Sequence, residues 1–163
     1  MNFLFLTVGG TIDKIYFDEL SDYQVGEPGV ARILNQLPLT FAYRIQSLLR
    51  KDSLDMTEDD RQLVRRTVAE SAESHIVITH GTDTMIETAK LLLDLPGKHI
   101  VLTGAMQPAS FQNSDAVFNL GMAIGVVLSQ PQSGVWITMS GQVFDPRTTR
   151  KNRSKGVFET VTP

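Results

Sequence analysis

Short apolar runs, each followed by glycine, threonine or other polar residues, recur along the chain. Such runs cover residues 3–8, 76–78, 99–103 and 134–139. Uninterrupted apolar runs of this length are typical of strands that are buried on both faces of a parallel sheet. The segment 41–49 alternates between apolar and polar residues at its start, which predicts one further strand.

Segments with helical periodicity separate these strands. Apolar residues return at helical spacing between residues 58 and 74, and Thr57 with Asp60 resembles a capping box at the start of that segment. The other predicted helices cover residues 29–37, 85–95 and 115–128. The alternation of strands and helices predicts an α/β fold with a doubly wound, mostly parallel sheet, a three-layer domain of the Rossmann-like or flavodoxin-like kind.

Right-handed connections in such a fold bring alternate loops to one edge of the sheet. We expect the loops 9–29, 50–57, 80–84 and 104–114 at the edge where the strands end. Ligands of open α/β sheets bind at that edge. Residues 12–29 show neither a helical nor a strand period, so we predict a long irregular loop, of which residues 12–27 act as a lid over the site.

Composition narrows the functional classes. With 163 residues, of which 42% are hydrophobic, the chain is predicted to form one domain over residues 1–163. The lack of cysteine excludes disulfides and thiolate catalysis. A net charge of −3 argues against nucleic-acid and membrane partners, so we interpret the basic tail as a solvated face. No apolar run approaches a membrane span and residues 1–6 lack a basic leader, so a cytoplasmic protein is expected.

Two of the buried runs lead into glycine followed by threonine. These pairs are Gly10 with Thr11 and Gly81 with Thr82. A hydroxyl becomes a useful nucleophile when a base takes its proton, and a lysine with a lowered pKa can be that base. A threonine, a lysine and an aspartate together would therefore support covalent catalysis, with backbone N–H groups of a glycine turn stabilising an oxyanion.

Two other interpretations remain open at this stage. Thr82 or Asp83 could simply cap the helix that follows, because such residues are the usual occupants of helix N-termini. The turn at residues 9–11 could instead bind a phosphate, although neither common glycine-rich nucleotide motif is present. The three histidines are not spaced as metal ligands, and we expect neither a metal nor another cofactor.

Two motifs resemble signatures of the bacterial-type L-asparaginases. Residues 7–12, TVGGTI, resemble the N-terminal signature T-G-G-T-I with Val8 in place of a glycine, and residues 80–85, HGTDTM, match the second signature throughout. Further similarity lies in residues 22–26, 104–108 and 150–152. The resemblance covers essentially the whole chain.

The resemblance implies covalent amide hydrolysis in two stages. Thr11 would be the nucleophile, with Tyr23 on the lid helping to take its proton, while Thr82, Asp83 and Lys151 form a second group. In the family the threonine of the second signature has also been argued to be the nucleophile. The division of roles between Thr11 and Thr82 therefore stays open.

The resemblance also implies a binding site for an amino acid. Ser53 would hold the α-carboxylate of the substrate, Asp83 the α-ammonium, and the backbone N–H of Ala105 the oxyanion. Leu54 stands where the family commonly has glutamine, which removes one polar contact. The predicted substrate-binding positions are Gly10, Asp52, Ser53, Gly81 and Ala105.

The family's usual chain is longer and has a smaller C-terminal domain that contributes an acid across a subunit interface. We expect this domain to be absent here, as in the short single-domain asparaginases of some bacteria, and we expect a homo-oligomer. The predicted function is hydrolysis of L-asparagine to aspartate and ammonia. The alternatives are a non-catalytic amino-acid-binding or regulatory module, and an amidase or amidotransferase that acts on a larger amide.

Overall fold

The computed structural model of the chain describes residues 2–161. Its centre is a six-stranded sheet with the strand order β4-β1-β5-β6-β7-β8, in which only β8 runs antiparallel to its neighbour. In chain order the parallel strands are arranged 2-1-3-4-5, which is the flavodoxin-like order. The strands are β1 (Asn2–Gly9), β4 (Ala42–Lys51), β5 (His75–Thr79), β6 (His99–Thr103), β7 (Gly134–Met139) and β8 (Gln142–Phe144).

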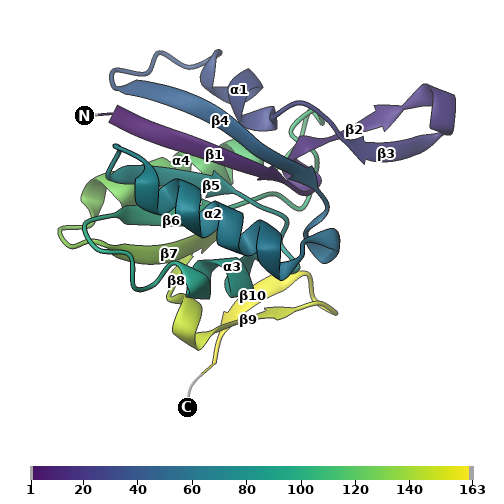
Figure 1. Cartoon of the computed structure of the whole chain (residues 1–163). Helices are drawn as coiled ribbons and strands as arrows, with labels where there is room; N and C mark the ends of the chain where they lie inside the picture. Colours follow the sequence, from purple (N-terminus) through teal and green to yellow (C-terminus); the bar gives the residue numbers. More distant parts are fainter. Residues whose placement is uncertain (1, 162–163) are drawn as a thin grey trace.

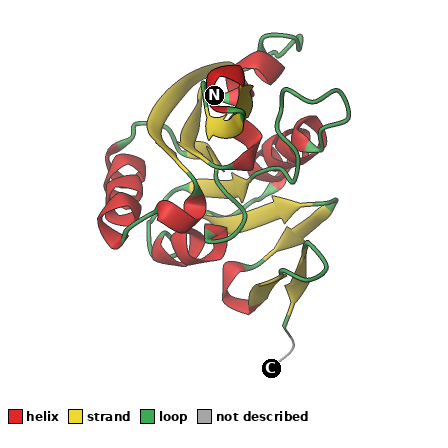
Figure 2. Ribbon diagram, turned by 90° about the vertical axis from the view of Figure 1, so that its right-hand side faces the viewer, coloured by secondary structure: helices red, strands yellow, loops and turns green. Residues whose placement is uncertain are grey.

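Helices cover both faces of this sheet and complete the three layers (Figure 2). The helices are α1 (Gly29–Leu34), α2 (Glu58–Glu70), α3 (Met85–Leu91) and α4 (Ala116–Ser129). One apolar cluster joins the sheet to α2 and α3, which lie in front of it in Figure 1, and a second cluster joins the sheet to α1 and α4. The predicted doubly wound α/β fold is confirmed.

The predicted helix starts agree with the structure better than the predicted helix ends do. At α2 the predicted capping box is present, because Thr57 Oγ1 accepts a hydrogen bond from Asp60 N at 3.2 Å and Asp60 Oδ2 accepts one from Thr57 N at 2.8 Å. The predicted end at residue 74 was wrong. The helix ends at Glu70, because Ser71 is extended and its side chain donates back to the Val68 carbonyl at 2.8 Å. Helix α3 likewise ends at Leu91 rather than at residue 95.

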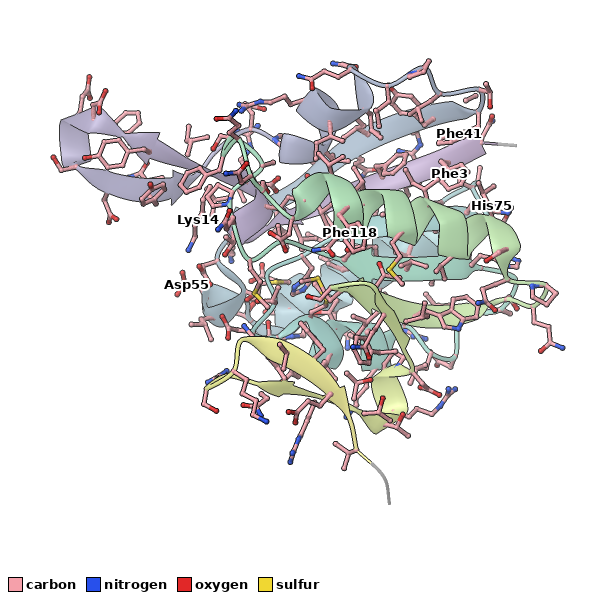
Figure 3. The ribbon with its side chains drawn as sticks, turned by 180° about the vertical axis from the view of Figure 1, so that it is seen from behind. Phe3, Lys14, Phe41, Asp55, His75 and Phe118 are labelled. Atoms are coloured by element: carbon pink, nitrogen blue, oxygen red, sulfur yellow. The ribbon has the colours of Figure 1, made fainter. Side chains whose placement is uncertain are left out.

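The segment predicted as an irregular loop is a β-hairpin, so that part of the prediction was wrong. Strands β2 (Lys14–Phe17) and β3 (Asp22–Val25) pair antiparallel and follow a short 3₁₀ turn, Thr11–Asp13. The hairpin projects from the body of the molecule (Figure 3). Because neither of its faces is buried in the core, its sequence carries no hydrophobic alternation.

The basic tail also forms a hairpin. Strands β9 (Thr149–Asn152) and β10 (Val157–Thr160) pair antiparallel and lie beside α3 (Figure 1). Phe158 of β10 is buried and contacts Phe144, with 6.0 Å between the ring centroids. This contact fixes the hairpin to the sheet, so the tail is not only the solvated face that was predicted. In the part of the chain described here, no helix is long and apolar enough to cross a membrane.

Candidate active site

A row of buried threonines marks the level at which the parallel strands end. Each threonine stands in register with the next across β1, β5, β6 and β7, and all are at most 1% exposed. The row consists of Thr7, Thr79, Thr103 and Thr138. Because these strands end level with one another, the loops that follow leave the sheet at one edge.

Glycines let the loops at this edge approach one another closely. A Cβ atom on Gly10 would lie 2.4 Å from Gly81 Cα, and one on Gly81 would lie 2.5 Å from Ser53 Oγ. Gly10 also has φ of 92°, which side chains rarely allow, and its N–H donates to the Lys51 carbonyl at 3.0 Å. The predicted meeting of the loops after β1, β4 and β5 is confirmed.

Lys151 reaches this edge from the C-terminal hairpin. Its Nζ donates to Thr82 Oγ1 at 2.7 Å and to Asp83 Oδ1 at 2.9 Å, and its side chain is only 13% exposed. Arg153 Nε lies 3.5 Å from the same oxygen of Asp83, a contact that the sequence did not predict. A hydroxyl, an amine and a carboxylate are therefore joined as covalent catalysis requires.

The capping interpretation of this segment was wrong. The N-cap of α3 is Thr84, and neither Thr82 nor Asp83 caps the helix with its side chain. Thr84 Oγ1 instead donates to the Ser53 carbonyl at 2.8 Å, which ties the loops after β4 and β5 together. The side chains of Thr82 and Asp83 are thus available to Lys151.

Thr11 and Tyr23 line a separate open cavity of about 480 Å³. Tyr23 lies on β3, opposite Tyr16, with ring centroids 5.4 Å apart, and its ring is 6.1 Å from that of Phe111. The full lining is Thr11, Lys14, Asp22, Tyr23, Met106, Gln107, Pro108 and Phe111. Thr82, Asp83 and Lys151 are not part of this lining, although Gly10 and Gly81, which precede Thr11 and Thr82, lie close together.

The loop that carries Ala105 is held from helix α4. Asp115 accepts hydrogen bonds from the N–H groups of Met106 at 2.9 Å and Gln107 at 3.0 Å. Asn119 Nδ2 donates to the Gly104 carbonyl at 3.1 Å. The sequence predicted only the helix over residues 115–128 and did not indicate either anchor. They hold buried Ala105 at the edge of the sheet.

The family model for the N-terminal domain of asparaginases matches residues 2–161. The chain belongs to this family. It is similar to L-asparaginase 2 of Escherichia coli (strain K12), with 31% identity over 96% of this chain and 48% of the relative, and to the glutaminase-asparaginase of Pseudomonas fluorescens biotype A, with 29% identity over 92% and 45%.

Solved structures agree with this assignment. The thermostable L-asparaginase of Thermococcus kodakarensis matches with a TM-score of 0.86 and 27% identity, over 98% of this chain and 51% of that one. The chain thus spans about half the length of the relatives that it matches.

Asp52, a predicted substrate-binding residue of this asparaginase domain, contacts the N-terminal hairpin. Its Oδ2 lies 2.8 Å from Lys14 Nζ, and its Oδ1 accepts a hydrogen bond from Leu54 N at 3.1 Å. Burial alone would raise the pKa of Asp52, but the hydrogen bonds from Lys14 and from the backbone outweigh it and lower the pKa. The carboxylate therefore stays charged and joins the hairpin to the loop after β4.

Two buried ionisable groups lie in the segments that follow β1 and β5. Burial lowers the pKa of His80 to about 4, so the ring is neutral. Its Nδ1–H donates to the Gly81 carbonyl at 2.8 Å, and its Nε2 accepts from the Thr88 hydroxyl at 2.8 Å. Burial raises the pKa of Asp13 to about 6, although Asp13 accepts a hydrogen bond from Gly29 N at 2.7 Å.

Among residues 2–161, no group of three or more His, Cys, Asp or Glu side chains could hold a metal ion.

Proposed function

We propose that the chain hydrolyses the side-chain amide of L-asparagine to aspartate and ammonia through a threonine nucleophile. The observation that carries the proposal is the pair of hydrogen bonds from Lys151 to Thr82 and Asp83. Membership of the asparaginase N-terminal family supports it, as do relatives that are named L-asparaginases. Thr11 completes the arrangement, because the glycines that precede Thr11 and Thr82 touch.

In the proposed first stage, Thr11 Oγ attacks the amide carbon and Tyr23 takes the hydroxyl proton. The backbone N–H of Ala105 stabilises the oxyanion. The C–N bond then breaks, and the amide nitrogen takes the proton that Tyr23 received and leaves as ammonia. Water then hydrolyses the ester to release aspartate and free the threonine. The contact with Lys151 also suits Thr82 as a nucleophile. Comparing kcat of Thr11→Ala with kcat of Thr82→Ala separates these roles.

In the same proposal the charged ends of asparagine bind on the side of the sheet edge where β4 and β5 end. Ser53 is nearly buried against Gly81 and would donate to the α-carboxylate. Asp83 is 30% exposed and would accept hydrogen bonds from the α-ammonium. The amide would then point toward Thr11.

A cytoplasmic location and self-association are further parts of the proposal. The absence of cysteine fits a reducing compartment. Exposed apolar side chains on α4, including Val117 and Phe118, support contact with a second copy. Sedimentation velocity tests the association, and cell fractionation tests the location.

The decisive experiment measures aspartate and ammonia released from L-asparagine by the purified protein. We expect equal amounts of both products. Thr11→Ala and Lys151→Met should each lower kcat by at least ~100-fold, because the first removes the proposed nucleophile and the second removes the amine that contacts Thr82 and Asp83. Lys155→Met is the matched control, since Lys155 is on the same hairpin but 70% exposed.

Two other outcomes would contradict parts of the proposed function. Asparagine that binds without turnover, as measured by calorimetry, would identify a non-catalytic amino-acid-binding module. Near-normal kcat in both Thr11→Ala and Lys151→Met, with thermal unfolding like that of the parent protein, would contradict the catalytic roles proposed for Thr11 and Lys151.

A further inference from the structure

The cavity that Thr11 and Tyr23 line does not include the charged and polar groups Ser53, Asp83 and Lys151. In the proposed function the charged ends of asparagine bind to Ser53 and Asp83, and the amide carbon lies at Thr11. Because Thr11 is part of the cavity wall, a group attached to the amide nitrogen can extend into this cavity.

Apolar side chains dominate the wall of the cavity. Tyr23, Met106 and Phe111 are 44%, 36% and 42% exposed, so each presents unburied apolar surface. Of the charged groups of the lining, Lys14 is paired with the Asp52 carboxylate at 2.8 Å. Asp22 accepts one local backbone hydrogen bond, from the N–H of Tyr23 at 2.7 Å. The cavity therefore offers a ligand mainly aromatic and apolar contacts.

The cavity is larger than the release of ammonia requires. Its volume is about 480 Å³, whereas a molecule the size of water takes up only about 30 Å³ of liquid volume. Sites for small organic ligands range from roughly 300 to 1,000 Å³. A leaving group with a ring would fit where ammonia would leave most of the space empty.

Hydrogen bonds hold both walls of the cavity. At the root of the hairpin, Gly26 N donates to the Asp13 carbonyl at 2.8 Å, and Ala109 N donates to the Ile12 carbonyl at 3.0 Å. The opposite wall is held by Asp115, through the N–H groups of the loop after β6. The aromatic contact between Tyr23 and Phe111 then joins the two walls.

We propose that the site also hydrolyses secondary amides, namely L-asparagine with an aromatic or apolar group on the side-chain amide nitrogen. This proposal rests on the proposed function and extends its substrate class. Thr11 Oγ forms the ester to the amide carbon, the C–N bond breaks, and the amine leaves with the proton that the hydroxyl has lost. Water then hydrolyses the ester to aspartate, as it does for the primary amide. Phe111 and Tyr23 hold the ring of the leaving amine.

The test compares L-asparagine with its N4-phenyl derivative, whose hydrolysis releases aniline. We expect the purified protein to hydrolyse both. Phe111→Ser should lower kcat/KM for the phenyl derivative relative to asparagine by at least about 10-fold, because the ring loses an apolar contact. The ratio corrects for any effect on Tyr23, which both substrates need. Leu37→Ser, at a 41% exposed leucine that follows α1, is the matched control and should leave the ratio unchanged.

The possible results distinguish a failure of the secondary-amide proposal from a failure of the proposed function. Hydrolysis of asparagine without any release of aniline would overturn the secondary-amide proposal and leave the proposed function standing. Failure to hydrolyse either substrate would overturn the proposed function itself. Aniline release with the same ratio in Phe111→Ser as in the parent protein would show that the cavity does not hold the leaving group.

Discussion

Asp83 serves two cations at once. Its Oδ1 accepts the hydrogen bond from Lys151, while Arg153 Nε lies 3.5 Å from the same atom. The arginine is 67% exposed, so it forms a weak surface pair that a ligand can displace. In the proposed function the α-ammonium of asparagine needs this carboxylate, and Arg153 therefore competes with the substrate.

Removing that competitor should improve substrate binding. We predict that Arg153→Gln lowers KM for asparagine by up to about 5-fold and changes kcat by less than about 2-fold, because an exposed pair contributes at most about 1 kcal/mol. Steady-state kinetics at low and high salt measure the effect, which should shrink as salt screens the pair. Arg147→Gln is the control, since Arg147 is also exposed but pairs with Asp145. An increase in KM would show that Arg153 holds the substrate.

At the scale of elements, the hairpin of β2 and β3 carries Tyr23 to the site. Two contacts at its root, the pair of Lys14 with Asp52 and the hydrogen bond from Ala109 N to the Ile12 carbonyl, attach it to the body of the protein. An isolated two-stranded hairpin is marginally stable, so its backbone amides should exchange readily with solvent. A bound ligand under Tyr23 adds contacts to one face of the hairpin.

We therefore predict that saturating aspartate slows amide hydrogen exchange in residues 14–25 by at least about 10-fold, which corresponds to about 1.4 kcal/mol of added local stability. Hydrogen exchange read by mass spectrometry gives the rates. The buried strand β5 is the internal control, because its amides should be protected with or without the ligand. Identical exchange of the hairpin in both states would contradict its role as a lid.

At the scale of the whole molecule, two buried groups give opposite pH dependences. The pKa of Asp13 rises from 3.8 to about 6 on folding, so the folded state binds more protons between these values and the free energy of unfolding falls as pH rises. The pKa of His80 falls from 6.5 to about 4, so there the free energy of unfolding rises with pH. Each shift corresponds to roughly 3 kcal/mol, and the two largely cancel.

Of these two pH dependences, removing the carboxylate of Asp13 should leave only that of His80. We predict that the free energy of unfolding of Asp13→Asn, relative to the parent protein, increases by up to roughly 3 kcal/mol between pH 4 and pH 6 and then levels off. Only the parent loses stability as Asp13 ionises. Urea denaturation across this range measures the difference. Asp59→Asn, at an exposed carboxylate on α2, is the control, and a difference independent of pH in Asp13→Asn would refute the assignment.

The amino-acid sequence by itself determined the mostly parallel sheet and the edge where its loops meet, whereas the flavodoxin-like strand order came only from the structure. Buried strands need uninterrupted apolar runs, and close contact between loops needs glycine, as at Gly10 and Gly81. The capping box at Thr57 was equally readable, because it depends on residues that are close in sequence. The glycine–threonine pairs at residues 10–11 and 81–82 were also readable, and the resemblance to the family signatures then implied the roles of Thr11 and Thr82.

Tertiary structure alone decided which side chains meet. Lys151 and Thr82 are 69 residues apart, and only the packing of the C-terminal hairpin brings them within 2.7 Å. Both hairpins were missed because neither has a full buried face, so their sequences lack the alternation that marks a strand. The anchors Asp115 and Asn119 and the second cation, Arg153, escaped for a related reason. Their roles depend on distances between elements, which no local pattern of residues records.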